Sequence, residues 1–117
     1  MKRLYDCFRQ RDNETPFEYY AEDIVWDARS THMIGLDDVY RGHEGVRHFW
    51  RQWLDAWEKI EFEATEPEEL ADGRIHVLVR QRNLGREAGV WIDQRPYHHF
   101  WTLADGKVTR VEFSWED

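Results

Sequence analysis

The stretch Tyr40-Arg41-Gly42-His43-Glu44-Gly45-Val46, followed by the tryptophan-rich run from His48 to Ile60, decides how this chain folds. Its glycines predict a turn that leads into one amphipathic helix. Apolar residues then recur at offsets of 4, 3, 4 and 3 residues, which places them on one stripe of a helix. They are Val46, Trp50, Trp53, Trp57 and Ile60. The opposite side carries Arg47, Arg51, Gln52, Asp55, Glu58 and Lys59. A large apolar partner must face the stripe, either a packed core or a cavity.

Length and cysteine content limit the class of protein. A chain of 117 residues fits one domain, 1–117, that buries a single core. No apolar run is long enough to span a bilayer, and Met1–Cys7 lacks the apolar stretch of a signal peptide, so we expect a soluble cytoplasmic protein without a membrane partner. Cys7 is the only cysteine, which excludes an internal disulfide and any metal site built on several cysteines.

The composition combines a strongly polar, acidic chain with many aromatic residues. Lys and Arg total 16 against 24 Asp and Glu, and the net charge of −8 argues against nucleic acid as a partner. The mean hydropathy is −0.87, yet the chain holds 7 Trp, 5 Tyr and 6 Phe. A polar surface around an aromatic interior indicates an aromatic-lined pocket or subunit interface, with an ordinary aromatic core as the alternative.

The first half of the chain reads as helices around one strand. Lys2–Arg11 predicts a short helix, and Thr15-Pro16-Phe17-Glu18 predicts a second, with Thr15 as the N-cap of a capping box. Alternating apolar residues predict a strand at Ile24–Arg29, and Ser30–Asp38 reads as a loop.

From residue 61 onward the period changes to 2, which is typical of antiparallel strands. We expect strands at Ile60–Leu70, Ile75–Leu84, Val90–Leu103 and Val108–Trp115, with a bulge at Pro96 and an interruption at Pro67. Asp72-Gly73 and Asp105-Gly106 predict hairpin turns. The order of elements predicts an α+β fold in which about three N-terminal helices pack on a strongly curved antiparallel or mixed sheet.

Three phrases of the sequence resemble the nuclear transport factor 2-like superfamily, and within it the SnoaL-like and ketosteroid-isomerase-like proteins. They are Tyr20-Ala21-Glu22-Asp23-Ile24-Val25-Trp26, the Tyr40 to Val46 phrase, and Thr102-Leu103-Ala104-Asp105-Gly106-Lys107-Val108. The resemblance covers nearly the whole chain and implies a cone-shaped α+β barrel. It further implies a homodimer packed through the convex sheet face, and a small apolar or aromatic ligand in the cone. It does not specify an activity, since the superfamily includes isomerases, cyclases, epoxide hydrolases, dehydratases and proteins without catalysis.

Strand alternation sorts the side chains that would face the cone. On the last strand we expect Val111, Phe113 and Trp115 to point inward, and on Ile75–Leu84 we expect Val77, Val79, Gln81 and Asn83 inward with Arg80 and Arg82 outward. The family phrase places His99 inward, together with Trp101, Tyr97, Arg95 and, if the bulge at Pro96 keeps the phase, Asp93. The remaining walls would be Trp26, Ala28, Tyr40, Trp50, Trp53 and Trp57.

His99 is the first candidate for chemistry. An imidazole in an apolar cone has its charged form disfavoured and can act as a base near neutral pH, with Tyr97, Arg95, Gln81 or Asn83 assisting. The alternative is a core histidine bound to a backbone carbonyl. His98, its neighbour, should face outward.

Two activities of the superfamily fit the sequence poorly. Asp93 and Arg95 have the spacing of the epoxide hydrolases, but no second inward Asp is evident, so a structural ion pair is the alternative. The base of the ketosteroid isomerases falls on Ala28, with Asp27 on the opposite face. The Tyr donor of those enzymes falls on Leu4, beside Tyr5, and their Asp donor falls on His99.

The six histidines, His32, His43, His48, His76, His98 and His99, include no carboxylate-backed i, i+4 pair, so we expect no metal and no cofactor. Three functional hypotheses remain open. The first is a cofactor-independent isomerase, cyclase or hydrolase that uses His99. The second is a non-catalytic module that binds an aromatic ligand through Trp26, Trp50, Trp53 and Trp115. The third is a structural domain whose cone is filled by side chains.

Overall fold

The computed structural model describes residues 2–29 and 37–115, and most of the predicted loop Ser30–Asp38 lies outside them. The helices are α1 (Lys2–Arg9), the 3-10 helix η1 (Thr15–Tyr19) and α2 (Gly42–Ala56). The strands are β1 (Tyr20–Asp27), β2 (Val39–Arg41), β3 (Trp57–Ala64), β4 (Glu68–Glu69), β5 (Ile75–Gly85), β6 (Trp91–Asp93), β7 (Tyr97–Ala104) and β8 (Lys107–Trp115). The α+β prediction is confirmed, with two α-helices and one 3-10 helix where three helices were expected.

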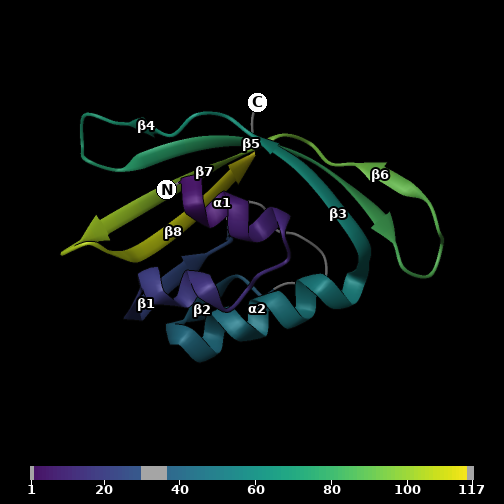
Figure 1. The fold of residues 1–117 in the computed structure, drawn as a ribbon, viewed down its shortest axis with the longest axis horizontal. Helices are drawn as coiled ribbons and strands as arrows, with labels where there is room; N and C mark the ends of the chain where they lie inside the picture. The colour runs from purple at the N-terminus through teal and green to yellow at the C-terminus, as the bar shows by residue number, and fades with distance from the viewer. Residues whose placement is uncertain (1, 30–36, 116–117) are drawn as a thin grey trace.

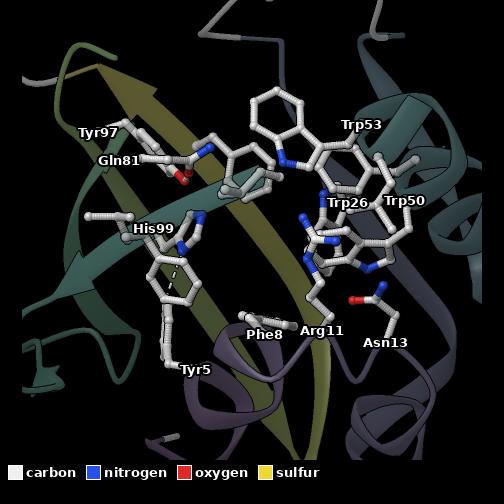
Figure 2. A pocket seen from close by; sticks show the side chains of 16 residues that line it. Tyr5, Phe8, Arg11, Asn13, Trp26, Trp50, Trp53, Gln81, Tyr97 and His99 are labelled. Atoms are coloured by element: carbon white, nitrogen blue, oxygen red, sulfur yellow. Dashed lines mark hydrogen bonds between the residues drawn. The ribbon is translucent and has the colours of Figure 1, made fainter. Parts of the chain in front are cut away.

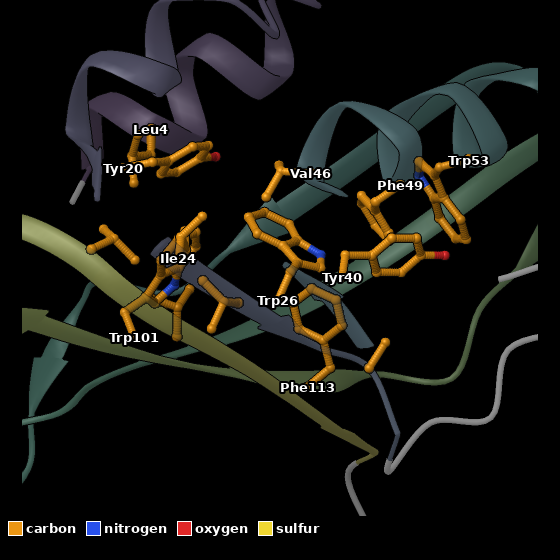
Figure 3. Close-up of a cluster of buried hydrophobic side chains, with 14 of the residues drawn as sticks. Leu4, Tyr20, Ile24, Trp26, Tyr40, Val46, Phe49, Trp53, Trp101 and Phe113 are labelled. Carbon is orange, nitrogen blue, oxygen red and sulfur yellow. The ribbon is translucent and has the colours of Figure 1, made fainter. Parts of the chain in front are cut away.

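The strands form one mixed sheet in the order β2-β1-β8-β7-β5-β3, with β4 and β6 also paired to β5. β1 and β8 pair in parallel, and the other pairs are antiparallel. The sheet curves over α1 and α2, which lie on its concave side (Figure 1). The core between these layers contains Ile24, Trp26, Val46, Trp101 and Phe113, all buried (Figure 3).

Two glycines explain the phrase that opens α2. Gly42 has a φ of 70°, a left-handed conformation that disfavours side chains. At Gly45 an added Cβ would lie 3.1 Å from the backbone carbon of Tyr40, closer than ordinary packing allows. Tyr40 itself pairs with Trp26 across β2 and β1. The phrase therefore lets the helix begin directly against the strand that precedes it.

The helix is shorter than its apolar pattern predicts. It ends at Ala56, and Trp57 and Ile60 lie on β3, so the predicted five-residue stripe is wrong in its last two members. The Arg86 guanidinium donates to the carbonyls of Leu54, Asp55 and Trp57 and so satisfies the end of the helix. The buried residues of α2 are Val46, Phe49 and Trp53, while Trp50 is half-buried at the flank.

The predicted capping box at Thr15 is also wrong. The Asp12 carboxylate accepts hydrogen bonds from the backbone N–H groups of Glu14 and Thr15, at 3.2 and 3.0 Å, while no side chain caps η1 from its N-cap position, Glu14. A carboxylate three residues earlier in the chain therefore does the work that the Thr15 hydroxyl was expected to do.

The single strand predicted over Val90–Leu103 is divided into β6 and β7. Val79 pairs with Tyr97 and Arg82 with Asp93, so two residues of β5 lie opposite three of the other strand between these pairs. This extra residue is the bulge expected at Pro96. It reverses the alternation, and Asp93 therefore lies on the outer face beside Arg82, not inside the cone.

Substituting Gly45→Ala should lower the free energy of unfolding by roughly 1–3 kcal/mol, because the new methyl group overlaps Tyr40. Gly85→Ala is the matched control, since its Cβ would make only an ordinary contact of 3.7 Å with the Val90 carbonyl oxygen. Urea unfolding of both variants measures the difference. Equal stability of the two would contradict this account of the opening phrase.

Candidate functional site

A pocket lies between α1, α2 and the concave side of the sheet (Figure 2). Its lining combines aromatic and aliphatic side chains with a few polar groups. The residues are Tyr5, Phe8, Arg11, Asn13, Trp26, Phe49, Trp50, Trp53, Leu54, Ile60, Phe62, Val79, Gln81, Tyr97, His99 and Phe113.

The volume of the pocket is about 80 Å³. An apolar cavity of roughly 150 Å³ accommodates benzene, so this pocket holds at most part of one ring unless the side chains at its solvent end move aside. Arg11 is exposed, and Trp50 is one of several half-buried residues of the lining, so side chains at the solvent end have room to move. The pocket size therefore depends on the conformation of its mouth.

A buried chain of hydrogen bonds orients His99. The Trp101 indole Nε1–H donates to the Tyr5 hydroxyl oxygen at 2.8 Å, and that oxygen lies 2.7 Å from His99 Nδ1. Because the indole can only donate, Tyr5 accepts from Trp101 and directs its own O–H to Nδ1. The neutral ring then carries its proton on Nε2. No residue within 2–29 or 37–115 accepts a hydrogen bond from Nε2, and the ring lines the pocket.

Burial sets the protonation states along this chain. Loss of solvation lowers the pKa of His99 to about 3, with a smaller contribution from the charge of His76. Burial also raises the pKa of Tyr5 well above its usual value. At neutral pH both groups are uncharged, Tyr5 as a phenol and His99 as an imidazole that offers an N–H.

A second polar chain lies beside the first. The Tyr97 hydroxyl donates to Gln81 Oε1, and Gln81 Nε2 donates to Asn83 Oδ1 at 2.8 Å. Burial raises the pKa of Tyr97, so it too stays protonated. Asn83 is fully buried and its Nδ2 has no partner among the residues that the structure describes. Tyr97 and Gln81 thus face the pocket with part of their hydrogen-bonding capacity already used.

Half of the predicted site residues meet at this pocket. Its lining contains Trp26, Trp50, Trp53, Val79, Gln81, Tyr97, His99 and Phe113. The inward orientation predicted for Val77, Val79, Gln81 and Asn83 is also observed, since all four are buried while Arg80 and Arg82 are exposed.

The other predicted residues lie outside the pocket lining. Trp101, Val111 and Asn83 are buried behind it, while Tyr40 accepts a hydrogen bond from the backbone of Asp37. Trp57 begins β3, and Trp115 lies near the end of β8 with the exposed Arg95 guanidinium 5.8 Å from its ring centre. The carboxylate of Asp93 is exposed and lies 3.7 Å from Arg82.

The carboxylate nearest in sequence to the isomerase base position also faces away. Asp27 is bound by Arg29 at 2.7 Å and Arg110 at 2.5 Å. Hydrogen bonding to Arg29 is the main reason that its pKa is lowered. Asp27 is absent from the pocket lining, as the alternation along β1 predicts, so it does not stand where the isomerase base would be.

Sequence reasoning missed eight lining residues. They are Tyr5, Phe8, Arg11, Asn13, Phe49, Leu54, Ile60 and Phe62. The spacing of Tyr5 and Phe8 on α1, and of Ile60 and Phe62 on β3, carried a signal for one face of each element. Arg11 and Asn13 follow α1 in irregular backbone, where periodicity gives no orientation.

Among residues 2–29 and 37–115, no group of three or more His, Cys, Asp or Glu side chains is placed to hold a metal ion. Within the same ranges no helix has the length and apolar character needed to cross a membrane.

Comparison with known proteins agrees with this architecture. The family model of the SnoaL-like domain matches residues 1–111. The structure of TerC co-crystallised with polyporic acid is 26% identical, with a TM-score of 0.80 over 96% of this chain and 85% of TerC. An NTF2-like protein of unknown function from Burkholderia pseudomallei is 23% identical, with a TM-score of 0.81 over 96% of this chain and 84% of that one.

A third structure, from Mesorhizobium loti and assigned as a SnoaL-like polyketide cyclase, is 20% identical, with a TM-score of 0.77 over 97% of this chain and 94% of that one. A search of curated protein sequences gave no match. The family model and the shared fold confirm the resemblance seen in the sequence: the chain belongs to the SnoaL-like domain family of the nuclear transport factor 2-like superfamily.

Proposed function

We propose that this protein binds a small organic molecule in the pocket, with His99 donating a hydrogen bond to an oxygen of the ligand. The observation that carries the proposal is the chain from Trp101 through Tyr5 to His99, which leaves the Nε2–H directed to no described protein group. Because this ring lines the pocket, its N–H is free to donate to an acceptor atom of a ligand.

The aromatic lining supplies the affinity. Trp26, Phe49 and Trp50 form one wall, with ring centres 5.2 to 6.2 Å apart. Rings at such distances offer faces and edges to a planar ligand, and burial of apolar surface is the main source of binding energy in such pockets. TerC, a relative that was co-crystallised with polyporic acid, supports an organic ligand for this chain as well.

A catalytic form of this proposal is the second candidate. The sequence suggested His99 as a base, but its Nδ1 lone pair is engaged by Tyr5 and its pKa is about 3. The arrangement favours a neutral imidazole that stabilises a developing oxyanion, as a cofactor-independent isomerase or cyclase requires. Among the other predicted catalytic residues, Tyr97 faces the pocket, whereas Arg95 and Asp93 are exposed outside it.

We also propose the homodimer that the resemblance implies. Both α-helices lie on the concave side, so the single chain leaves the convex face of the sheet uncovered (Figure 1). That face carries a partly exposed ring cluster, His76, His98 and Phe100, in which His76 Nε2 and His98 Nδ1 are 2.6 Å apart. Partly buried rings on an open sheet face suit a subunit interface.

Exchange of His99 tests the donor role. His99→Asn keeps an acceptor near the Nδ1 position for Tyr5 but removes the Nε2–H, whereas His99→Gln returns an N–H near Nε2. We expect benzamide, a ring with a carbonyl acceptor, to bind His99→Asn about fivefold more weakly, which corresponds to roughly 1 kcal/mol for one hydrogen bond. His99→Gln should bind it more tightly than His99→Asn.

Benzamide titrations followed by NMR chemical shifts of the tryptophan indole N–H groups give these affinities. Equal binding by wild type and both variants would remove His99 from the site. Failure of benzamide to perturb Trp26, Trp50 or Trp53 in the wild type would favour a cone filled by side chains.

The neutral state of His99 predicts a pH dependence of stability. The pKa of this group is 6.5 in an unfolded chain and about 3 in the folded protein, so the unfolded state binds more protons between these values. The stabilisation is fully present above about pH 6.5 and is lost as the pH falls toward 3. Wild type should therefore lose more stability than His99→Asn between about pH 7 and pH 4.5 in urea unfolding. Parallel curves would show that His99 protonates without cost.

The dimer proposal is tested by charge on the convex face. Phe100→Glu should shift the protein from dimer to monomer in sedimentation equilibrium at micromolar concentration, because it replaces the ring with a charge that the interface must desolvate. Val90→Glu, which alters an exposed residue of the turn before β6, is the control and should remain dimeric. A monomeric wild type would overturn the proposal.

A further inference from the structure

The charge of the pocket differs from that of the protein. The chain has a net charge of −8, yet among residues 2–29 and 37–115 those that line the pocket include no Asp or Glu. They include one permanently cationic side chain, Arg11. The Arg11 guanidinium therefore lies beside an aromatic pocket in an acidic protein. A ligand with a negative charge would be attracted to it.

The surroundings of Arg11 do not neutralise it. Its guanidinium donates to the Glu58 carbonyl oxygen at 2.6 Å, and within residues 2–29 and 37–115 it forms no ion pair. The acidic residues that follow in the chain are engaged elsewhere: the Asp12 carboxylate accepts backbone N–H groups, and Glu14 lies 3.9 Å from Arg47. One edge of the guanidinium is therefore anchored to β3, while the rest stays available to an anion.

Two further donors of residues that line the pocket have no partner among the described residues. His99 presents its Nε2–H, and the indole N–H of the buried Trp26 has no partner among the described residues. Figure 2 shows Arg11 on the same side of the pocket as Trp26 and Trp50, with His99 across from them. A ligand that lies between these walls meets donors at both ends and so needs acceptor oxygens.

We propose that the pocket selects aromatic acids, with the ring among the tryptophans and the acidic group at Arg11. This inference rests on the proposed ligand-binding function and names its substrate class. The acidic group lies at the solvent end, where Arg11 and Asn13 meet it; in a ligand that carries a second oxygen across the ring, that oxygen accepts from His99. The bound acid then forms an ion pair with the Arg11 guanidinium.

A cationic ligand is the main competitor, because aromatic walls also attract ammonium groups. Binding of an ammonium group in such a pocket requires a carboxylate nearby, or at least no protein cation beside the same rings. The pocket lining offers no carboxylate and places the Arg11 guanidinium beside the rings, so an ammonium group is repelled.

Three probes with the same ring distinguish these possibilities: benzoate, benzamide and benzylamine, which are anionic, neutral and cationic at pH 7. We expect benzoate to bind wild type about fivefold more tightly than benzamide, with benzylamine weakest, a ratio that allows for the solvent exposure of Arg11. Added salt should reduce this preference by screening the charge. Affinities come from NMR titrations of the tryptophan indole signals.

Arg11→Gln should abolish the preference for benzoate over benzamide, and Arg11→Lys should restore part of it. Arg51→Gln, which removes the same charge outside the pocket lining, should behave as wild type. Thermal unfolding of each variant controls for loss of the Glu58 contact. If benzamide and benzoate bind equally, or if Arg11→Gln keeps the preference, the inference is overturned while ligand binding stands. If no probe binds, the proposed function itself fails.

Discussion

The buried hydrogen bonds that join Trp101, Tyr5 and His99 are the constraint on which the pocket depends. They connect α1 to β7 across 96 and 94 positions of the chain, so the first helix and the sheet must meet in one register. A shift of α1 would leave the indole N–H, a phenol and an imidazole unpaired in an apolar interior, and each such group costs about 1–3 kcal/mol. The same bonds set the tautomer of His99 and form one wall of the pocket.

Much of the sheet was predictable because its signals are local. The Asp105-Gly106 turn has φ values of 52° and 77°, as a two-residue hairpin requires, and the alternation along β5 separates buried from exposed residues correctly. The ends of α2 and η1 were not predictable in this way. Arg86, far along the chain, satisfies the carbonyls where α2 ends, and Asp12 displaces Thr15 as the capping group. Periodicity alone would have continued the helix through Trp57 and Ile60.

The residues of the candidate site likewise fall into those that local patterns predicted and those that depend on tertiary packing. Gln81 was placed by strand alternation, while the family resemblance placed His99 and alternation from His99 placed Tyr97; alternation holds as long as no residue is inserted. Beyond the bulge at Pro96 the phase reverses, and Asp93 emerges on the outer face beside Arg82. Tyr5 and Arg11 reach the pocket from the N-terminal segment, and their positions depend on how α1 packs against the sheet. No spacing rule within the sequence contains that information.

The environment of His99 limits the chemistry that this pocket can perform. The burial that lowers its pKa also makes it a dependable donor, since it remains an uncharged N–H over the whole physiological range. The carboxylate that stands nearest to a base position, Asp27, lies outside the pocket and is held as an anion by Arg29 and Arg110. A reaction here would therefore take its base from the substrate or from water. The protein would contribute by stabilising negative charge on oxygen, and the same donors that favour such a charge in a transition state favour an acidic ligand in the ground state.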